Sequence, residues 1–214
     1  MGGRGSSSSS GGGGGTGGVG AGDIISTTSL VSARESQAKE VDEVLSVFND
    51  VYNEYGSQVN DIQIAVMDSK SHAMAYYDFG DNIAVNAAYF NSAKMTSAME
   101  SCVQSGFHPS TGNKTAMQAV VAHELGHKLT ADVATKLGQS GFSGLDAAAG
   151  KIVREAKKKT GHKKSADLAA QISGYAKTNH AETVAEAYCD VYCNGSKAKR
   201  ESRAIVDVIN GYLK

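Results

Sequence analysis

The stretch that decides the fold is His-Glu-Leu-Gly-His at positions 123–127 of the 214-residue chain. Two histidines four residues apart on a helix project from nearly the same face, so the imidazoles of His123 and His127 can reach one metal ion. On such a helix Glu124 is rotated by about 100° from His123. There its carboxylate can accept a proton from metal-bound water without becoming a ligand. The pattern favours a metal-dependent hydrolase; the alternative is a helix with two surface histidines.

A pair of acidic residues follows on a later helix, which we expect from about 181 to 193. Catalytic zinc sites usually have three protein ligands and a water molecule, so the two histidines need a third partner. Glu182 and Glu186 lie one helical turn apart, and like charges at that spacing repel unless a cation compensates them. A metal ion and its histidines would supply that charge. Taken alone, Glu182 suits the positive end of a helix and Glu186 suits solvent.

The segment from Tyr175 to Glu186 carries a resemblance to a known family. It reads Tyr, three residues, Asn, two residues, Glu, and then Ala-Glu three residues on. This resembles the second motif of gluzincin zinc metallopeptidases related to the anthrax lethal factor catalytic domain. The same pairing of motifs occurs in metallopeptidases attached to bacteriophage minor head proteins. The two motifs span His123 to Glu186, roughly a third of the chain.

The resemblance implies a zincin-like metallopeptidase with one zinc ion per chain. In this sequence it assigns His123, His127 and Glu182 as the zinc ligands and Glu124 as the general base. Zinc lowers the pKa of bound water to about 7, so hydroxide is available at neutral pH. Glu124 would take the proton of that water and pass it to the leaving amine. The expected reaction is hydrolysis of peptide bonds in a peptide or protein substrate.

Two further roles come from the same resemblance. Tyr175 is expected to donate its phenol hydroxyl to the tetrahedral oxyanion, which is typically worth about 100-fold or more in rate. Glu186 is expected to support the ligands without touching the metal. The segment departs from the family at Thr183-Val184, where relatives tend to carry aromatic residues. His180 is a second departure, and it is either a spectator or a competing ligand.

The rest of the chain predicts an α+β fold, with a small mixed sheet packed on several helices, one of which carries the HELGH segment. Short or alternating apolar runs predict strands at 62–66, 73–77 and 82–86, with a turn at Gly80-Asp81. Apolar residues at helical spacing predict helices at about 32–55, 92–103, 115–130, 165–174, 181–193 and 197–213. Ser165 is expected to be the N-cap of its helix.

Two features near the HELGH helix each have two interpretations. The strand at 82–86 is either the edge strand on which a zincin pairs an extended peptide or an ordinary sheet strand. His108 lies in the loop before the helix and either lines the cleft or serves as a loop or capping histidine. His72 and His162 are expected at the surface.

Composition separates a tail from one domain. The first 22 residues hold twelve of the 25 glycines and five serines. They cannot bury apolar surface, so residues 1–24 are expected to form a flexible, disordered tail. Residues 25–214 are expected to form one domain, because hydrophobic residues make up 41% of the chain. The tail either tethers this domain to a larger protein or phage particle or is a processing remnant.

Charge and apolar runs exclude several classes of protein. The net charge of −1 argues against a nucleic-acid binder. No run approaches the ~18 apolar residues of a membrane span, and no signal peptide follows Met1. The expected location is therefore cytoplasmic or virion-associated. The three cysteines fit reduced thiols, and Cys189 and Cys193 are either small buried side chains or a metal-binding pair.

The leading functional hypothesis is a zinc-dependent peptidase of the gluzincin type. One rival is a phage virion component that keeps the metallopeptidase fold without cleaving anything. Another is an effector that binds a protein through the segment 151–164, which holds seven Lys or Arg residues and one acid; this segment is otherwise a solvated helix end. Glu124 and Tyr175 favour the enzyme, because a structural zinc site needs neither a general base nor an oxyanion donor.

Overall fold

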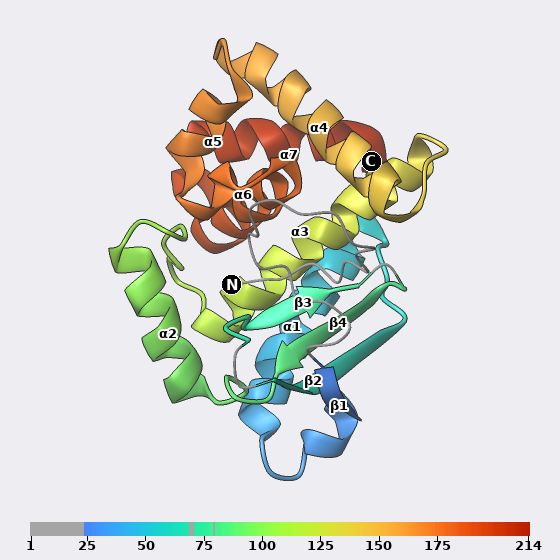
Figure 1. The fold of residues 1–214 in the computed structure, drawn as a ribbon, viewed down its shortest axis with the longest axis vertical. Helices are drawn as coiled ribbons and strands as arrows, with labels where there is room; N and C mark the ends of the chain where they lie inside the picture. The colour runs from blue at the N-terminus through green and yellow to red at the C-terminus, as the bar shows by residue number, and fades with distance from the viewer. Residues whose placement is uncertain (1–23, 69–70, 79) are drawn as a thin grey trace.

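The computed structural model describes residues 24–68, 71–78 and 80–214. The expected tail, apart from Ile24, lies outside the described residues. A small sheet lies on one side of the molecule and a group of helices on the other, with the long helix α3 (Ala116–Lys136) between them (Figure 1). Among the described residues, no helix is long and apolar enough to cross a membrane.

The sheet described by the structure is mixed. Its strands are β1 (Ile24–Ser29), β2 (Asp61–Met67), β3 (Ala75–Tyr77) and β4 (Asn82–Asn86). They are arranged in the order β1-β2-β4-β3. The pairs β1–β2 and β3–β4 are antiparallel, and β2–β4 is parallel. The mixed sheet expected from the sequence is therefore present.

Strand β4 lies inside this sheet, so the interpretation of residues 82–86 as an edge strand is wrong. One side of β4 pairs with β2, where Asp61 lies opposite Asn82. The other side pairs with β3 across the turn that contains Asp81, whose φ of 58° is a left-handed conformation that aspartate tolerates. Both hydrogen-bonding sides of β4 are thus used within the sheet. The edges are β1 and β3, and β3 contacts α3.

Strand β1 has no counterpart among the expected strands. Its sequence Ile-Ile-Ser-Thr-Thr-Ser is exposed except for the half-buried Ile24. The sequence of this strand does not alternate between apolar and polar residues, although its β-branched residues favour an extended chain. Pairing with β2, rather than burial, defines this strand.

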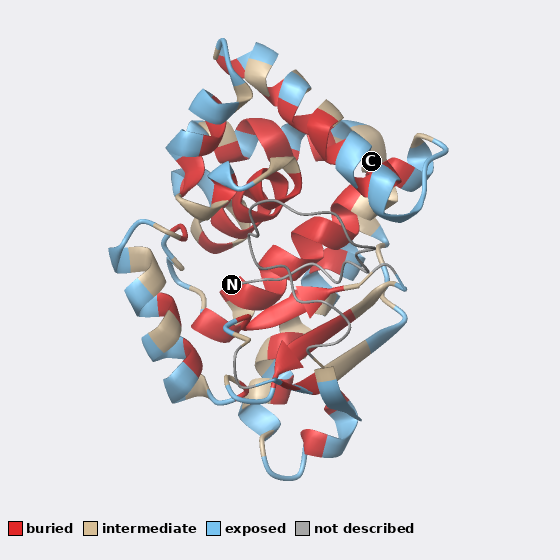
Figure 2. Cartoon of the chain, in the orientation of Figure 1, coloured by how far each residue is buried: buried red, intermediate tan, exposed pale blue. Residues whose placement is uncertain are grey.

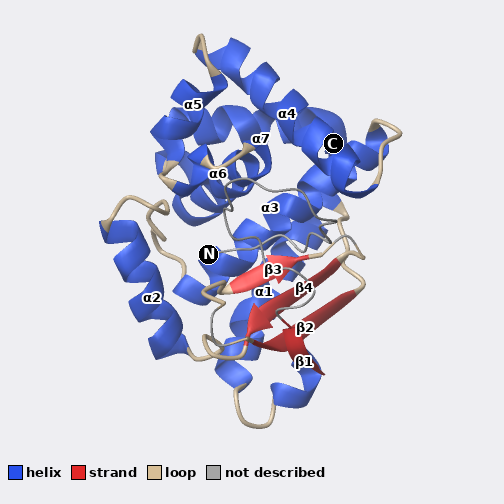
Figure 3. Cartoon of the chain, in the orientation of Figure 1, coloured by secondary structure: helices blue, strands red, loops and turns tan. Residues whose placement is uncertain are grey.

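Six of the α-helices occupy segments where the sequence predicts them, with bounds that differ by a few residues (Figure 3). Apart from α3, the α-helices of the described chain are α1 (Ala38–Tyr55), α2 (Ser92–Gln104), α4 (Gly141–Thr160), α5 (Ser165–Ile172), α6 (His180–Asn194) and α7 (Arg200–Leu213). For the remaining helix, α4, the sequence predicted only an end within residues 151–164, whereas the helix begins at Gly141. Short 3-10 helices are η2 (Leu30–Ala33), η3 (Tyr175–Lys177) and η4 (Gly195–Lys197). The predicted cap at Ser165 is wrong: this serine is the first helical residue, and Lys164 precedes it without a capping side-chain bond.

Helix α3 is the core element of the molecule. It begins at a capping box, in which Thr115 and Gln118 each accept a hydrogen bond from the other's backbone N–H. Residues Ala119 to Thr130 are buried without a break, as the red ribbon of Figure 2 shows. The helix packs against α1, α4, α6 and β3. The HELGH segment therefore lies in the interior.

A close approach between α3 and α6 brings the two sequence motifs together. A Cβ atom on Gly126 would lie 2.7 Å from the Cα of Ala185, so a glycine is needed at this crossing. Gly126 belongs to the HELGH segment, and Ala185 lies between the two glutamates of the second motif. The motifs thus meet across one helix pair.

The basic segment 151–164 forms the second half of α4 and the loop after it. Three lysines occupy the last turn, where the helix dipole favours positive charge. The carbonyl of Thr160 accepts a hydrogen bond from the Arg200 guanidinium at 2.7 Å. Lys157 Nζ donates to the carbonyl of Lys163 at 3.2 Å. These contacts give part of the segment a structural role at the end of a helix.

Candidate active site

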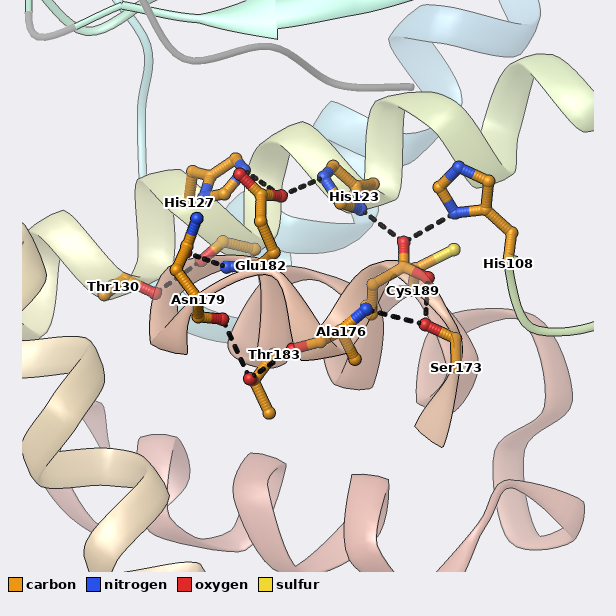
Figure 4. Close-up of polar contacts among 12 residues, drawn as sticks. His108, His123, His127, Thr130, Ser173, Ala176, Asn179, Glu182, Thr183 and Cys189 are labelled. Atoms are coloured by element: carbon orange, nitrogen blue, oxygen red, sulfur yellow. Dashed lines mark hydrogen bonds and ion pairs between the residues drawn. The ribbon is translucent and has the colours of Figure 1, made fainter. Parts of the chain in front are cut away.

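Three buried donor side chains converge between α3 and α6. His123 and His127 lie on α3, and Glu182 lies in the first turn of α6, where its backbone N–H is capped by the side chain of Asn179. Glu182 Oε2 is 3.2 Å from His123 Nε2 and 3.4 Å from His127 Nε2. Figure 4 shows the three side chains facing one another. The structure thus brings together the three residues predicted as ligands.

The spacing of these donors fits a zinc ion. Zinc binds nitrogen and oxygen ligands at about 2.0–2.2 Å in tetrahedral geometry, which puts neighbouring ligand atoms about 3.3 Å apart. The measured separations from Glu182 Oε2, 3.2 Å and 3.4 Å, agree with that value. Two imidazoles and a carboxylate are also a donor set that zinc prefers.

The electrostatics of the cluster favour a positive charge at this position. Burial opposes a charge on His123, but its contacts with Glu182 and Glu186 outweigh burial and raise its pKa to about 10. Burial would raise the pKa of the Glu182 carboxyl, but the imidazoles of His127 and His123 lower it below its ordinary value. A carboxylate held ionised beside two imidazoles is suited to a cation.

Glu186 supports the cluster from behind His123. Its Oε1 is 2.8 Å from His123 Nδ1 and 2.7 Å from His108 Nδ1, and its Oε2 accepts the hydroxyl of Ser173 at 2.7 Å. Burial would raise its pKa, but His108 and His123 lower it to about 2. An ionised carboxylate only accepts, so both Nδ1 atoms carry the proton. A metal ion that replaced the second ring proton of His123 would then be bound through Nε2, which lies beside His127 and Glu182.

This tautomer also accounts for a second buried group, formed by His108, His123 and Glu186. Its donor atoms lie close enough together to suit a metal ion. A protonated Nδ1 on His123 cannot bind a metal, and its hydrogen bond to Glu186 leaves Nε2 available. We therefore interpret this second group as a hydrogen-bonded support for the first.

Glu124 lies beside the donor cluster and outside it. It is completely buried, and neither carboxylate oxygen has a hydrogen-bond partner. Burial raises its pKa, an effect that His123 and His127 partly offset. Glu124 lines a small cavity together with His108 and His123.

Tyr175, the first residue of η3, packs directly on the cluster. Its ring stacks on the imidazole of His123, with centroids 5.7 Å apart and planes inclined by 25°. Phe107 also packs against Tyr175, with ring centroids 5.1 Å apart. The backbone N–H of Tyr175 donates to the carbonyl of Phe107 at 2.9 Å. The structure therefore places Tyr175 within the site.

Two further residues belong to the site: His108, whose role the sequence left open, and Ser173, which the sequence did not assign. His108 is only 6% exposed and lines the same small cavity as Glu124. This position agrees with the first of its two interpretations, in which it lines the cleft. It is 78 residues from Glu186 in sequence. No local pattern marks a partner at that distance. Ser173, two residues before Tyr175, likewise carries no motif of its own.

A comparison with known families completes this picture. The model of peptidase family M48 matches residues 36–205, most of the chain. The chain belongs to peptidase family M48. No curated protein and no solved structure matches it. Peptidases of this family bind zinc, and His123, His127 and Glu182 form the buried metal-binding group of this M48 domain.

Membership in M48 confirms the two main predictions from the sequence. The zincin-like α+β architecture, with its small mixed sheet and its HELGH helix, is the one observed. The prediction of a zinc-dependent peptidase is also confirmed at the level of the family. As a peptidase, the M48 domain would bind protein substrates.

Other polar residues of the M48 domain lie apart from the metal-binding group. His180 Nδ1 faces Gly150 of α4, and His180 belongs to neither buried group of donors. Cys189 and Cys193 are buried and free, and among the described residues they take part in no such group either. The Cys189 thiol donates instead to the carbonyl of Ala119 at 3.3 Å. These cysteines are therefore small buried side chains.

The two histidines expected at the surface differ in their exposure. His72 is exposed, as predicted, whereas His162 has intermediate exposure. His162 Nε2 lies 3.0 Å from Glu201 Oε1, a contact between the loop after α4 and helix α7. Neither histidine belongs to the buried donor groups.

Proposed function

We propose that this M48 domain is a peptidase of the gluzincin type, with one zinc ion held by His123, His127 and Glu182. The observation that carries this proposal is the convergence of three buried donor atoms, with Glu182 Oε2 3.2 Å and 3.4 Å from the two imidazoles. When bound, zinc acidifies water to a pKa of about 7 and polarises the scissile carbonyl. The remaining functions fall to side chains of the protein.

Glu124 is the proposed general base. It follows His123 on α3 and is not among the three converging donors, so its carboxylate is left for proton transfer. Burial raises its pKa despite the nearby imidazoles. A carboxyl whose pKa is moved toward neutrality can take a proton from water and return it to the leaving amine.

Tyr175 is the proposed donor to the oxyanion that forms when water adds to the peptide carbonyl. The stacking of its ring on His123 supports this role, because it fixes the phenol beside a zinc ligand. A donor held in place before the reaction stabilises the developing charge without reorganisation. Glu186 has a positioning role, since it fixes the ring of His123 through Nδ1.

We further propose that this M48 domain is related to the lethal factor catalytic domain and to the metallopeptidases of phage head proteins. The spacing of Tyr175, Glu182 and Glu186 supports it. In this setting the Gly/Ser-rich residues 1–24 would tether the domain to a virion. A virion component without activity would need neither Glu124 nor Tyr175, so their presence in the site favours an active enzyme.

The test is cleavage of a mixed peptide library by the zinc-loaded protein and by its Glu124→Gln variant. We expect the variant to keep its zinc and its fold while kcat falls by roughly 10²–10⁴-fold, the usual contribution of a general base. Cleavage by Glu124→Gln at the wild-type rate would rule out the proposed mechanism. A zinc-loaded wild type that cleaves no peptide in the library would instead support the virion component.

A further inference from the structure

His108 is a buried histidine that no part of the proposed mechanism uses. It lies in the loop between α2 and α3, and its Nδ1 is 2.7 Å from Glu186 Oε1. The same oxygen accepts the Nδ1 proton of His123 at 2.8 Å. Figure 4 shows His108 on the other side of His123 from His127. One carboxylate oxygen therefore joins two imidazoles from different elements.

We propose that His108 is a positioning residue for the metal site, acting through Glu186 on His123. The inference rests on the ligand assignment proposed above. Two hydrogen bonds to Oε1 and one from Ser173 to Oε2 fix the plane of the Glu186 carboxylate. That plane sets the direction in which His123 Nδ1 donates, and hence the direction of its Nε2.

The chemistry of His108 argues against a role in packing alone. Its other ring nitrogen, Nε2, is buried without a hydrogen-bond partner. Burial of an unpaired polar atom costs free energy, and a phenylalanine or leucine would fill the space without that cost. The hydrogen bond from Nδ1 to Glu186 is what an imidazole offers here and an apolar side chain does not.

The loop that contains His108 is also hydrogen-bonded to the segment that contains Tyr175. The backbone N–H groups of Gly174 and Tyr175 donate to the carbonyls of Gly106 and Phe107 at 2.8 Å and 2.9 Å. The rings of His108 and Tyr175 meet edge to face, with centroids 5.4 Å apart. His108 thus lies where the loop before α3 is joined to both the proposed ligand His123 and the proposed oxyanion donor.

The test compares His108→Leu with His108→Asn in the full chain. The amide nitrogen of asparagine takes about the position of Nδ1 and keeps the donor to Glu186, whereas leucine removes it. We expect leucine to weaken zinc affinity by about 10–100-fold, measured by competition with a chelator, and asparagine to restore most of it. We also expect leucine to lower kcat more than it raises KM and to shift the visible spectrum of the cobalt-substituted protein.

Controls separate this inference from the ligand assignment. His162→Leu removes a half-buried histidine bonded to Glu201 and should leave zinc affinity unchanged. If zinc affinity falls in Glu182→Ala but not in His108→Leu, the ligand assignment stands and the proposed role of His108 is wrong. If neither variant changes zinc affinity, both the ligand assignment and the proposed role of His108 are wrong.

A leucine variant that fails to fold does not end the test. His108→Gln then replaces it, because the amide nitrogen of glutamine reaches the position of Nε2 rather than Nδ1 and leaves Glu186 without this donor. We expect His108→Gln to bind zinc about 10-fold or more weakly than His108→Asn. Equal affinities in the two variants would overturn the proposal.

Discussion

Two helix pairs in this molecule are buried for different reasons. In α4 and α7, which pack against each other, buried apolar residues such as Ile152 and Ile209 recur on one face while the other face meets solvent. In α3 and α6, residues Ala119–Thr130 and Ala181–Asp190 are buried without a break, and charged groups are among them. The first pair is held by apolar contact, whereas the second also has to accommodate buried charge.

The buried charged groups indicate the function of the α3–α6 pair. Burial of unpaired charge is costly, so charged groups inside a protein are paired or bind a metal. Ser173, His108 and His123 all bond to Glu186, and Glu182 lies within 3.4 Å of both HELGH histidines. The packing of α4 on α7 mainly stabilises the fold, whereas the packing of α3 on α6 also forms the metal-binding group. Substitutions in the two pairs should therefore change different measurements.

The largest effect we predict here concerns activity alone. Tyr175→Phe removes the phenol hydroxyl but keeps the ring that stacks on His123. Loss of one oxyanion donor typically costs about 100-fold or more in kcat. We expect that decrease in a peptide-cleavage assay, with zinc content and melting temperature as in the wild type. An unchanged kcat would show that Tyr175 only packs against the imidazole.

A matched pair of glycine substitutions tests the close packing of α3 on α6. In Gly126→Ala the new Cβ would lie 2.7 Å from the backbone of Ala185, so the helices must move apart. We expect a loss of about 1–3 kcal/mol in the free energy of unfolding and weaker zinc binding. In Gly150→Ala the Cβ meets only the side chains of Arg154 and His180, at 3.2 Å and 3.4 Å.

Gly150→Ala in α4 is the control for this prediction. Alanine is favoured over glycine in a helix by up to about 1 kcal/mol, so we expect its stability to be equal or higher. Denaturant unfolding of both variants measures the difference. Two variants of equal stability would contradict the idea that α3 and α6 need to lie unusually close.

The smallest predicted effect belongs to the apolar pair. Ile152→Val deletes one buried methyl group in α4, which typically costs about 0.5–1.5 kcal/mol of stability. Because this residue is outside the metal-binding group, kcat and zinc affinity should remain as in the wild type. A loss of zinc affinity in Ile152→Val would mean that the two helix pairs are not independent.

The same contrast explains what the sequence could predict. The apolar spacing of α1 and α7 marks amphipathic helices directly, so their existence follows from local pattern. The HELGH segment predicts its helix and its chemistry, because the spacing of the histidines is itself the requirement of the metal site. These features depend on neighbours in sequence.

Features that depend on distant partners were missed. β1 is exposed and is defined by its pairing with β2, and the inner position of β4 follows from its parallel pairing with β2. His108 acquires its place through a bond to Glu186, far away in the sequence. Such contacts leave no local period or spacing, so the structure was needed to find them.

The most direct test of the central claim is the zinc content of the purified chain, measured by elemental analysis for the wild type and for Glu182→Ala. Glu155→Ala in α4 is the control, since Glu155 accepts the Tyr212 hydroxyl away from the site. We predict about one zinc ion per chain in the wild type and the control and a loss of zinc in Glu182→Ala. A wild type without zinc, or zinc retained in Glu182→Ala, would contradict the proposed metal site.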